Sequence, residues 1–258
     1  MSDVLSPTHS LTLHNDAGQP YTLQLWLTSP QAPTLLLLDG DWLQECIQHF
    51  RKRHANSINI ACLGYGTTHA KTVIRRAYDF TPPHPDGLDI DPRVKEWKNG
   101  GAPAFSDFLE KTLIPTLAQH IDLNTSKLGL FGHSYAGLYA LYLWLQQRPL
   151  FDQYVVASPS VWWRWPYLHQ LAAAAPPTSA HAAPLHILLG EQEQWHPHPQ
   201  QPGQTRPPGE PTLPLIQAWL HALPQQLQPH CQLELCPQLA HGPMLAHSAT
   251  IAFEVMRL

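Results

Sequence analysis

The stretch of sequence that decides the fold reads Gly132-His133-Ser134-Tyr135-Ala136-Gly137. It follows a short apolar run at 128–131 and precedes an almost wholly apolar segment at 135–145, which is the pattern of a buried strand followed by a helix deep in the core. A tight strand-to-helix turn needs small flanking residues and leaves its serine hydroxyl exposed above the sheet edge. That oxygen also lies at a helix N-terminus, where the dipole favours developing negative charge. The sequence therefore predicts Ser134 as a nucleophile, the alternative being a glycine-rich turn with a capping serine.

This stretch departs mildly from the pattern that such turns usually follow. The usual spacing is G-x-S-x-G, whereas Ala136 occupies the fifth position here and Gly137 comes one residue later. Alanine is the smallest replacement for glycine, so we expect the turn to tolerate it.

Short apolar runs and longer helical patterns alternate on both sides of this stretch. The alternation at 21–28 indicates a half-buried antiparallel strand, and the continuous runs that follow are typical of strands buried on both faces of a parallel sheet. Helical spacing recurs near 42–50, 105–117 (where Pro115 should bend or end the helix), 135–145, 213–227 and 244–256. The order predicts an α/β fold whose mostly parallel central sheet of about eight strands has helices on both faces. We expect these strands near 11–14, 21–28, 34–39, 57–63, 127–132, 153–157, 185–190 and 231–236.

Length and composition exclude several classes of protein. A chain of 258 residues predicts a single domain over 1–258, with an Ala/Pro-rich excursion at 172–184 and a Pro-rich surface loop at about 195–214. The net charge is −4 and the longest basic run is 51–53, so we expect no nucleic-acid partner. The longest aliphatic run, 35–38, is far too short for a membrane span. No export signal is visible, which predicts a cytoplasmic location, or a periplasmic one if the N-terminus was trimmed.

A serine hydroxyl is a weak nucleophile unless a base and an orienting acid accompany it. On a strand–turn–helix scaffold of this kind, the acid and then the histidine follow the serine in the chain. Glu193 and Glu191 both come just after the predicted strand at 185–190, where the acid belongs. We take Glu193 as the first choice and Glu191 as the second, with ordinary surface glutamates as the alternative.

The base should lie between the last strand and the last helix. His241 occupies this loop, whereas helix spacing places its rival His247 inside the helix. His133, beside the serine, is expected to be structural. An H-x-H pair at His196 and His198 has no third ligand in any recognisable metal motif. We therefore expect neither a metal nor, since no phosphate-binding glycine motif occurs, a nucleotide cofactor.

Acyl transfer also requires hydrogen-bond donors directed at the oxyanion. The first should be the N–H of Tyr135, which follows the nucleophile. The second should come from the loop after the strand at 34–39, where Gly40 permits close backbone approach. We predict the N–H of Asp41, whose carboxylate must then point away from the developing negative charge.

With these features in place, the chain resembles the α/β-hydrolases of the esterase D type. Within that group it is most similar to the trilactone esterases that cleave catecholate siderophores such as enterobactin and salmochelin. The segments that carry the resemblance are Leu36-Leu37-Leu38-Asp39-Gly40, Arg76-Ala77-Tyr78-Asp79-Phe80-Thr81-Pro82, Gly100-Gly101, Phe105-Ser106-Asp107-Phe108-Leu109, Gly132-His133-Ser134-Tyr135, Ala157-Ser158-Pro159-Ser160, Trp162-Trp163 and His241-Gly242-Pro243-Met244.

The resemblance implies a serine hydrolase that cleaves ester or lactone bonds through an acyl-enzyme, on a small-molecule substrate that can arrive as an iron-loaded siderophore. It implies that Arg76 lies near the site and meets an anionic catecholate, unless it forms an ion pair with Asp79. Trp162 and Trp163 are expected to stack on catechol rings, unless they belong to the core. Some relatives use a Ser–His pair without an acid. An acyltransferase or general carboxylesterase, and a non-catalytic binding module on the same scaffold, are the alternatives.

Overall fold

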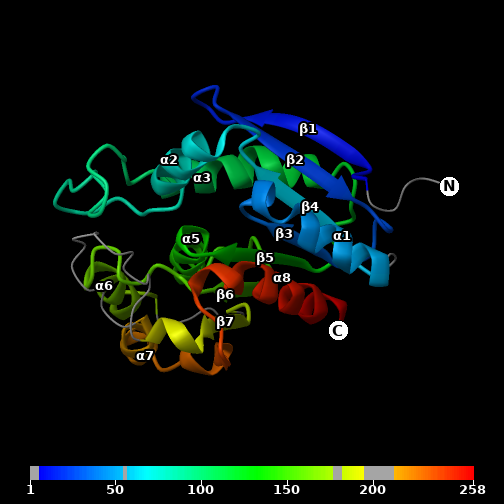
Figure 1. Cartoon of the computed structure of the whole chain (residues 1–258). Helices are drawn as coiled ribbons and strands as arrows, with labels where there is room; N and C mark the ends of the chain where they lie inside the picture. Colours follow the sequence, from blue (N-terminus) through cyan, green and yellow to red (C-terminus); the bar gives the residue numbers. More distant parts are fainter. Residues whose placement is uncertain (1–5, 55–56, 177–181, 195–211) are drawn as a thin grey trace.

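The computed structural model describes residues 6–54, 57–176, 182–194 and 212–258. Their centre is an eight-stranded sheet with the order β1-β2-β4-β3-β5-β6-β7-β8 (Figure 1). The first two strands run antiparallel to their neighbours, and all later pairs are parallel. The strands are β1 (His9–His14), β2 (Pro20–Trp26), β3 (Thr34–Leu37), β4 (Asn59–Gly64), β5 (Leu128–His133), β6 (Gln153–Ala157), β7 (Leu185–Gly190) and β8 (Cys231–Cys236).

Helices cover both faces of this sheet because its central strands are apolar on both sides. In β3, Leu36 packs into one hydrophobic cluster, whereas Leu35 and Leu37 pack into the other. Two helices that lie side by side, α1 (Gln44–Arg53) and α8 (His241–Arg257), cover the face of Leu35 and Leu37 (Figure 1). The other face is covered by α2 (His69–Asp79), α3 (Ala102–Phe108), α5 (Tyr135–Leu145), α6 (Tyr167–Ala173) and α7 (Thr212–Ala222).

The predicted fold class is confirmed, and the differences lie mostly at helix boundaries. The segment predicted as one helix at 105–117 is α3, a π-helical turn η2 (Leu109–Leu113) and α4 (Ile114–Leu117), and the irregular turn comes just before Pro115, which cannot donate a helical hydrogen bond. The predicted helix 213–227 ends early, at Ala222, because Pro224 follows. Helices α2 and α6 were not among the predicted elements.

Several sequence predictions concern segments that are only partly described. Of the Pro-rich stretch at 195–214, residues 195–211 lie outside the described residues and 212–214 belong to α7. Within the described residues no helix is both long and apolar enough to cross a membrane. The cytoplasmic location stays a prediction.

Candidate active site

Ser134 lies at the sharp turn between β5 and α5, with a backbone conformation that non-glycine residues rarely adopt. Its φ and ψ are 59° and −117°, a strained combination that persists only where the surroundings enforce it. Its N–H donates to the carbonyl of Ala157 at 3.0 Å. A side chain at Gly132 would lie 2.4 Å from the carbonyl oxygen of Ala136, so the turn requires glycine at that position.

The structure also explains why Ala136 is tolerated where the usual pattern has glycine. The close approach to β6 falls one residue later, at Gly137. A side chain there would meet the carbonyl oxygen of Ala157 at 3.0 Å and the Cα of Pro159 at 3.1 Å. Ala136 itself is fully buried in the core, so the pattern is shifted by one residue without loss of the turn.

Three side chains from the ends of different strands form a continuous hydrogen-bonded relay. His241 Nε2 lies 3.1 Å from Ser134 Oγ, and His241 Nδ1 lies 2.7 Å from Glu193 Oε2. A carboxylate only accepts, so Nδ1 carries the imidazole proton and Nε2 accepts from the serine hydroxyl. Glu193 is 1% exposed, whereas Ser134 is partly accessible. This arrangement can remove a proton from the serine and hold the resulting imidazolium.

The two glutamates considered from the sequence occupy different environments. Both belong to the turn η3 (Glu191–Gln194) after β7. Glu193 turns inward, and its Oε1 accepts hydrogen bonds from Ser158 Oγ at 2.6 Å and from the N–H of Gly190 at 3.0 Å. Glu191 is exposed, and its carboxylate accepts the N–H of Gln238 at 2.9 Å. Only Glu193 is therefore placed to orient the imidazole.

His241 is the first residue of α8 rather than a loop residue, which corrects the expected boundary. Its backbone carbonyl accepts a hydrogen bond from His133 Nε2 at 2.9 Å, and the two imidazole rings are 4.7 Å apart. His133 is therefore a structural neighbour that fixes the backbone of the base.

The segment after β6 supplies two contacts that the sequence interpretation did not assign. Ser160 Oγ lies 3.2 Å from Ser134 Oγ. Because the Ser134 proton is directed at His241, Ser160 is the donor in this pair. Ser158 holds Glu193 as described above, and both serines are buried. Their presence in the S-P-S segment was noted from the sequence, but no pattern in one chain shows which of its two hydroxyls reaches which partner.

The loop after β3 provides the predicted site for the second oxyanion donor. Asp41 belongs to the short helix η1 (Gly40–Trp42), and its carboxylate accepts the N–H of Tyr65 at 2.8 Å. Tyr65 follows β4, which lies on the opposite side of β3 from β5, so the carboxylate points away from Ser134 as expected. Tyr135 is the first residue of α5, where an N–H has no acceptor within the helix. The oxyanion role of both N–H groups stays a prediction.

The structure disagrees with the expected role of Arg76. Arg76 is 7% exposed. Its guanidinium binds the buried carboxylate of Asp39 through two hydrogen bonds, the longer of 2.7 Å. A buried charge needs such a partner, and this one engages Nε and Nη2 inside the protein. The alternative pairing with Asp79 is also wrong, because the ion pair of Arg76 is with Asp39, and Asp79 instead accepts the hydroxyl of Tyr21 at 2.9 Å. Arg76 instead stabilises the loop that follows β3.

The two tryptophans also have different environments. Trp163 is fully buried and its Nε1–H donates to Asn99 Oδ1 at 3.0 Å, so it is a core residue and cannot stack on a substrate. Trp162 is only partly buried, and its ring centroid lies 6.1 Å from that of Tyr135. Trp162 therefore remains a candidate for substrate contact.

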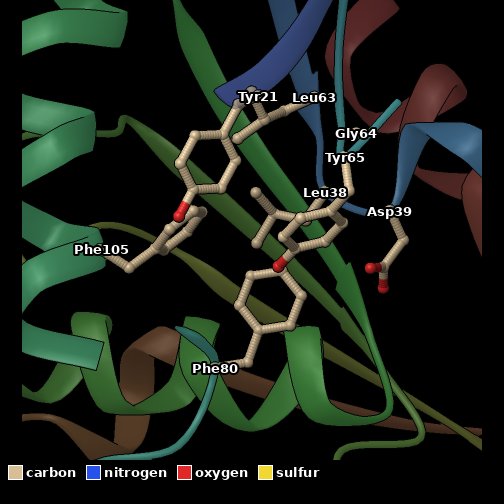
Figure 2. Close-up of a pocket in the computed structure, with 8 residues that line it drawn as sticks. All are labelled: Tyr21, Leu38, Asp39, Leu63, Gly64, Tyr65, Phe80 and Phe105. Carbon is tan, nitrogen blue, oxygen red and sulfur yellow. The ribbon is translucent and has the colours of Figure 1, made fainter. Parts of the chain in front are cut away.

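A small space near the amino-terminal half of the sheet is not a second binding site. Figure 2 shows aromatic side chains turned toward one another there, with the carboxylate of Asp39 at the edge. Phe80 packs edge-on against Phe105 at 5.2 Å, and Tyr21 lies 5.8 Å from Phe105. The space leaves no room for a water molecule and belongs to the aromatic core beneath Asp39.

The described part of the chain contains no group of three or more His, Cys, Asp and Glu side chains that could hold a metal ion. The H-x-H pair at His196 and His198 lies outside it.

Residues 18–200 match the model of the family described as "Putative esterase". The chain belongs to this esterase family. Among curated relatives, the chain is 33% identical to a siderophore enterobactin esterase of Emericella nidulans over 64% of its own length and 59% of the relative's. It is also 33% identical to the ferri-bacillibactin esterase of Bacillus subtilis, over 53% and 49% of the two lengths. The chain thus spans about half to three fifths of these relatives.

Solved structures match the chain over nearly its whole length. The siderophore hydrolase EstB from Aspergillus nidulans superimposes with a TM-score of 0.77, covering 96% of this chain and 94% of that chain at 22% identity. The enterobactin and salmochelin hydrolase IroE gives a TM-score of 0.70 at 24% identity. These matches show that the chain has the α/β-hydrolase fold.

Proposed function

We propose that this chain is a serine esterase that hydrolyses ester bonds of a siderophore, of the catecholate class, through an acyl-enzyme. The observation that carries the proposal is the continuous relay from Ser134 through His241 to the buried Glu193, with contacts of 3.1 and 2.7 Å. The relatives, which are named as siderophore esterases in a fungus and a bacterium, support the substrate class.

The chemistry follows from the positions of these groups. Ser134 Oγ attacks the ester carbonyl while His241 Nε2 takes its proton, and Glu193 stabilises the imidazolium. The N–H groups of Tyr135 and Asp41 bind the oxyanion. His241 then returns the proton to the leaving alkoxide, and a water activated by the same imidazole hydrolyses the acyl-enzyme.

Two measurements test the proposal. The first is the mass of the protein after treatment with diisopropyl fluorophosphate, which should add one phosphoryl adduct to the wild type and none to Ser134→Ala. The second is product analysis by mass after incubation with cyclic and linear enterobactin, with and without Fe(III), which should give opened and shortened products.

Two additions to the product analysis, an alcohol acceptor and p-nitrophenyl butyrate as a second substrate, distinguish the rivals. An acyltransferase would give a new ester when an alcohol acceptor is added, at the expense of free acid. A binding module would leave both enterobactin and p-nitrophenyl butyrate intact, and this result would reject the proposed function.

A further inference from the structure

One arginine beside the candidate site has no part in the relay. Arg93 lies in the segment 80–101, between α2 and α3. Its guanidinium carbon is 4.3 Å from the ring centroid of Trp162 and 4.8 Å from that of Tyr135. Its Nη2 donates to the Tyr135 hydroxyl at 2.6 Å. Two aromatic rings thus hold this cation in place.

A buried carboxylate fixes the same cluster from the other side. The Asp91 carboxylate accepts a hydrogen bond from the Tyr135 hydroxyl, and it also accepts hydrogen bonds from the backbone N–H groups of Arg93 and Val94 at 2.9 and 3.2 Å. Burial raises the pKa of Tyr135 far above its ordinary value, so the phenol stays a neutral donor to Asp91. The segment that carries Arg93 is therefore anchored directly to the residue after the nucleophile.

The guanidinium still has hydrogen-bonding capacity. Its side chain is 25% exposed, and no hydrogen bond within the described residues engages Nη1. Asp91, whose carboxylate lies 3.6 Å from Arg93 Nε, balances one positive charge. Arg164 adds a second on this side, because its Nη2 donates to the carbonyl of Ile90. The cluster of these three charged residues therefore carries a net positive charge in a chain whose own net charge is −4.

Chain connectivity places this cation beside the reacting groups. Tyr135 directly follows Ser134, and Trp162 comes two residues after Ser160, whose hydroxyl contacts Ser134 Oγ. The two aromatic rings that hold Arg93 therefore come from the two segments that meet at the nucleophile.

We propose that Arg93 is a specificity-determining residue that binds an anionic oxygen on the acyl part of the ester. This inference rests on the proposed esterase function. A guanidinium held rigidly by two rings loses little entropy when it binds, and its planar donors match a carboxylate or another anionic oxygen. Arg76, the cation expected from the sequence to do this, is buried and paired.

The test compares two p-nitrophenyl esters of similar length, the neutral butyrate and the glutarate monoester, whose acyl part ends in a carboxylate. The measured quantity is the anionic-to-neutral ratio, that is, kcat/KM for the glutarate monoester divided by kcat/KM for the butyrate. Arg93→Gln should lower this ratio about 10-fold or more, since a hydrogen bond to a charged group is lost. Lys95→Gln, which removes an exposed charge from the same segment, should leave the ratio within about 2-fold of wild type.

The possible failures are separable. If the wild type leaves both esters and enterobactin intact, the proposed function is wrong and the inference falls with it. If it hydrolyses esters but Arg93→Gln keeps the wild-type ratio, only the inference is wrong.

A measurement on the wild type alone guards against a variant that does not fold. The overall charge of −4 repels anions, so added salt should raise the ratio if no local cation acts. With Arg93 binding the carboxylate, raising the ionic strength from about 0.02 to 0.5 M should lower the ratio instead. A ratio that rises with salt would overturn the proposal.

Discussion

Replacing Glu193 with glutamine tests the relay with almost no change in shape. The hydrogen bonds fix how the new amide would lie. Gly190 N–H can only donate, so the amide oxygen must stay at the Oε1 position, 3.0 Å from it. The amide nitrogen then faces His241 Nδ1, which must accept. The imidazole proton moves to Nε2, opposite Ser134, and the histidine can no longer act as a base.

The structure sets the size of the effect. Recovering the active tautomer means flipping the amide, which turns its NH2 group toward the N–H of Gly190. Two donors then face each other without an acceptor, which costs about 1–3 kcal/mol, or roughly 5- to 150-fold in population. Loss of the charged acceptor for the imidazolium costs about 1.5–3 kcal/mol more, roughly 10- to 150-fold. Together these predict that Glu193→Gln lowers kcat/KM by about 10²- to 10⁴-fold, in line with other triads.

The assay is hydrolysis of p-nitrophenyl butyrate, with thermal unfolding to check that the variant folds. Glu191→Gln is the matched control, two residues away on the same turn but exposed, and it should stay within about 2-fold of wild type. If Glu193→Gln keeps more than a tenth of wild-type activity, the acid is dispensable and the site works as a Ser–His pair.

Three further outcomes are expected. Ser134→Ala should lower kcat by roughly 10⁴- to 10⁶-fold with little loss of stability; hydrolysis at the wild-type rate would remove it from the mechanism. Ser160→Ala should lower kcat/KM about 5- to 10-fold, the effect of one neutral hydrogen bond to Ser134 Oγ, and an unchanged rate would assign it to packing alone. Burial raises the pKa of Asp79 from 3.8 to about 6, so between these values the folded state holds a proton that the unfolded chain has lost. The free energy of unfolding should therefore fall by about 2 kcal/mol as pH rises from about 4 to 6. In urea unfolding across this range, Asp79→Asn should lack this fall, and an identical pH dependence in variant and wild type would contradict the burial cost.

Strand ends were predictable from the sequence because apolar runs and turns are local signals. The sheet therefore followed from the pattern, and so did the placement of Ser134, Glu193 and His241 after three of its strands. The sequence ranked Glu193 ahead of Glu191 but could not exclude Glu191, because that depends on whether a side chain turns toward Ser158 and Gly190 or toward solvent.

Pairings between distant segments were beyond the reach of one sequence. Arg76 binds Asp39, 37 residues away in the chain, whereas the sequence offered only the nearby Asp79 as its partner. Trp162 and Trp163 are adjacent, yet only the second is fully buried. The sequence could not show which one is buried, because the chain after β6 forms neither a helix nor a strand whose period would assign them to opposite faces. The role proposed for Arg93 was not predictable from the sequence either, since Asp91 and Tyr135 are brought together only by the fold.

The geometry of the relay depends on the order of strands in the sheet as much as on the turn at Ser134. Strand β6 lies between β5, which leads to the nucleophile, and β7, which leads to the acid. Its carboxyl end contacts both. Ala157 accepts the Ser134 N–H, Ser158 holds Glu193, and Ser160 contacts Ser134 Oγ. A displacement of this four-residue segment would therefore disturb the nucleophile and the acid together, so substitutions at Ser158 and Ser160 should be non-additive.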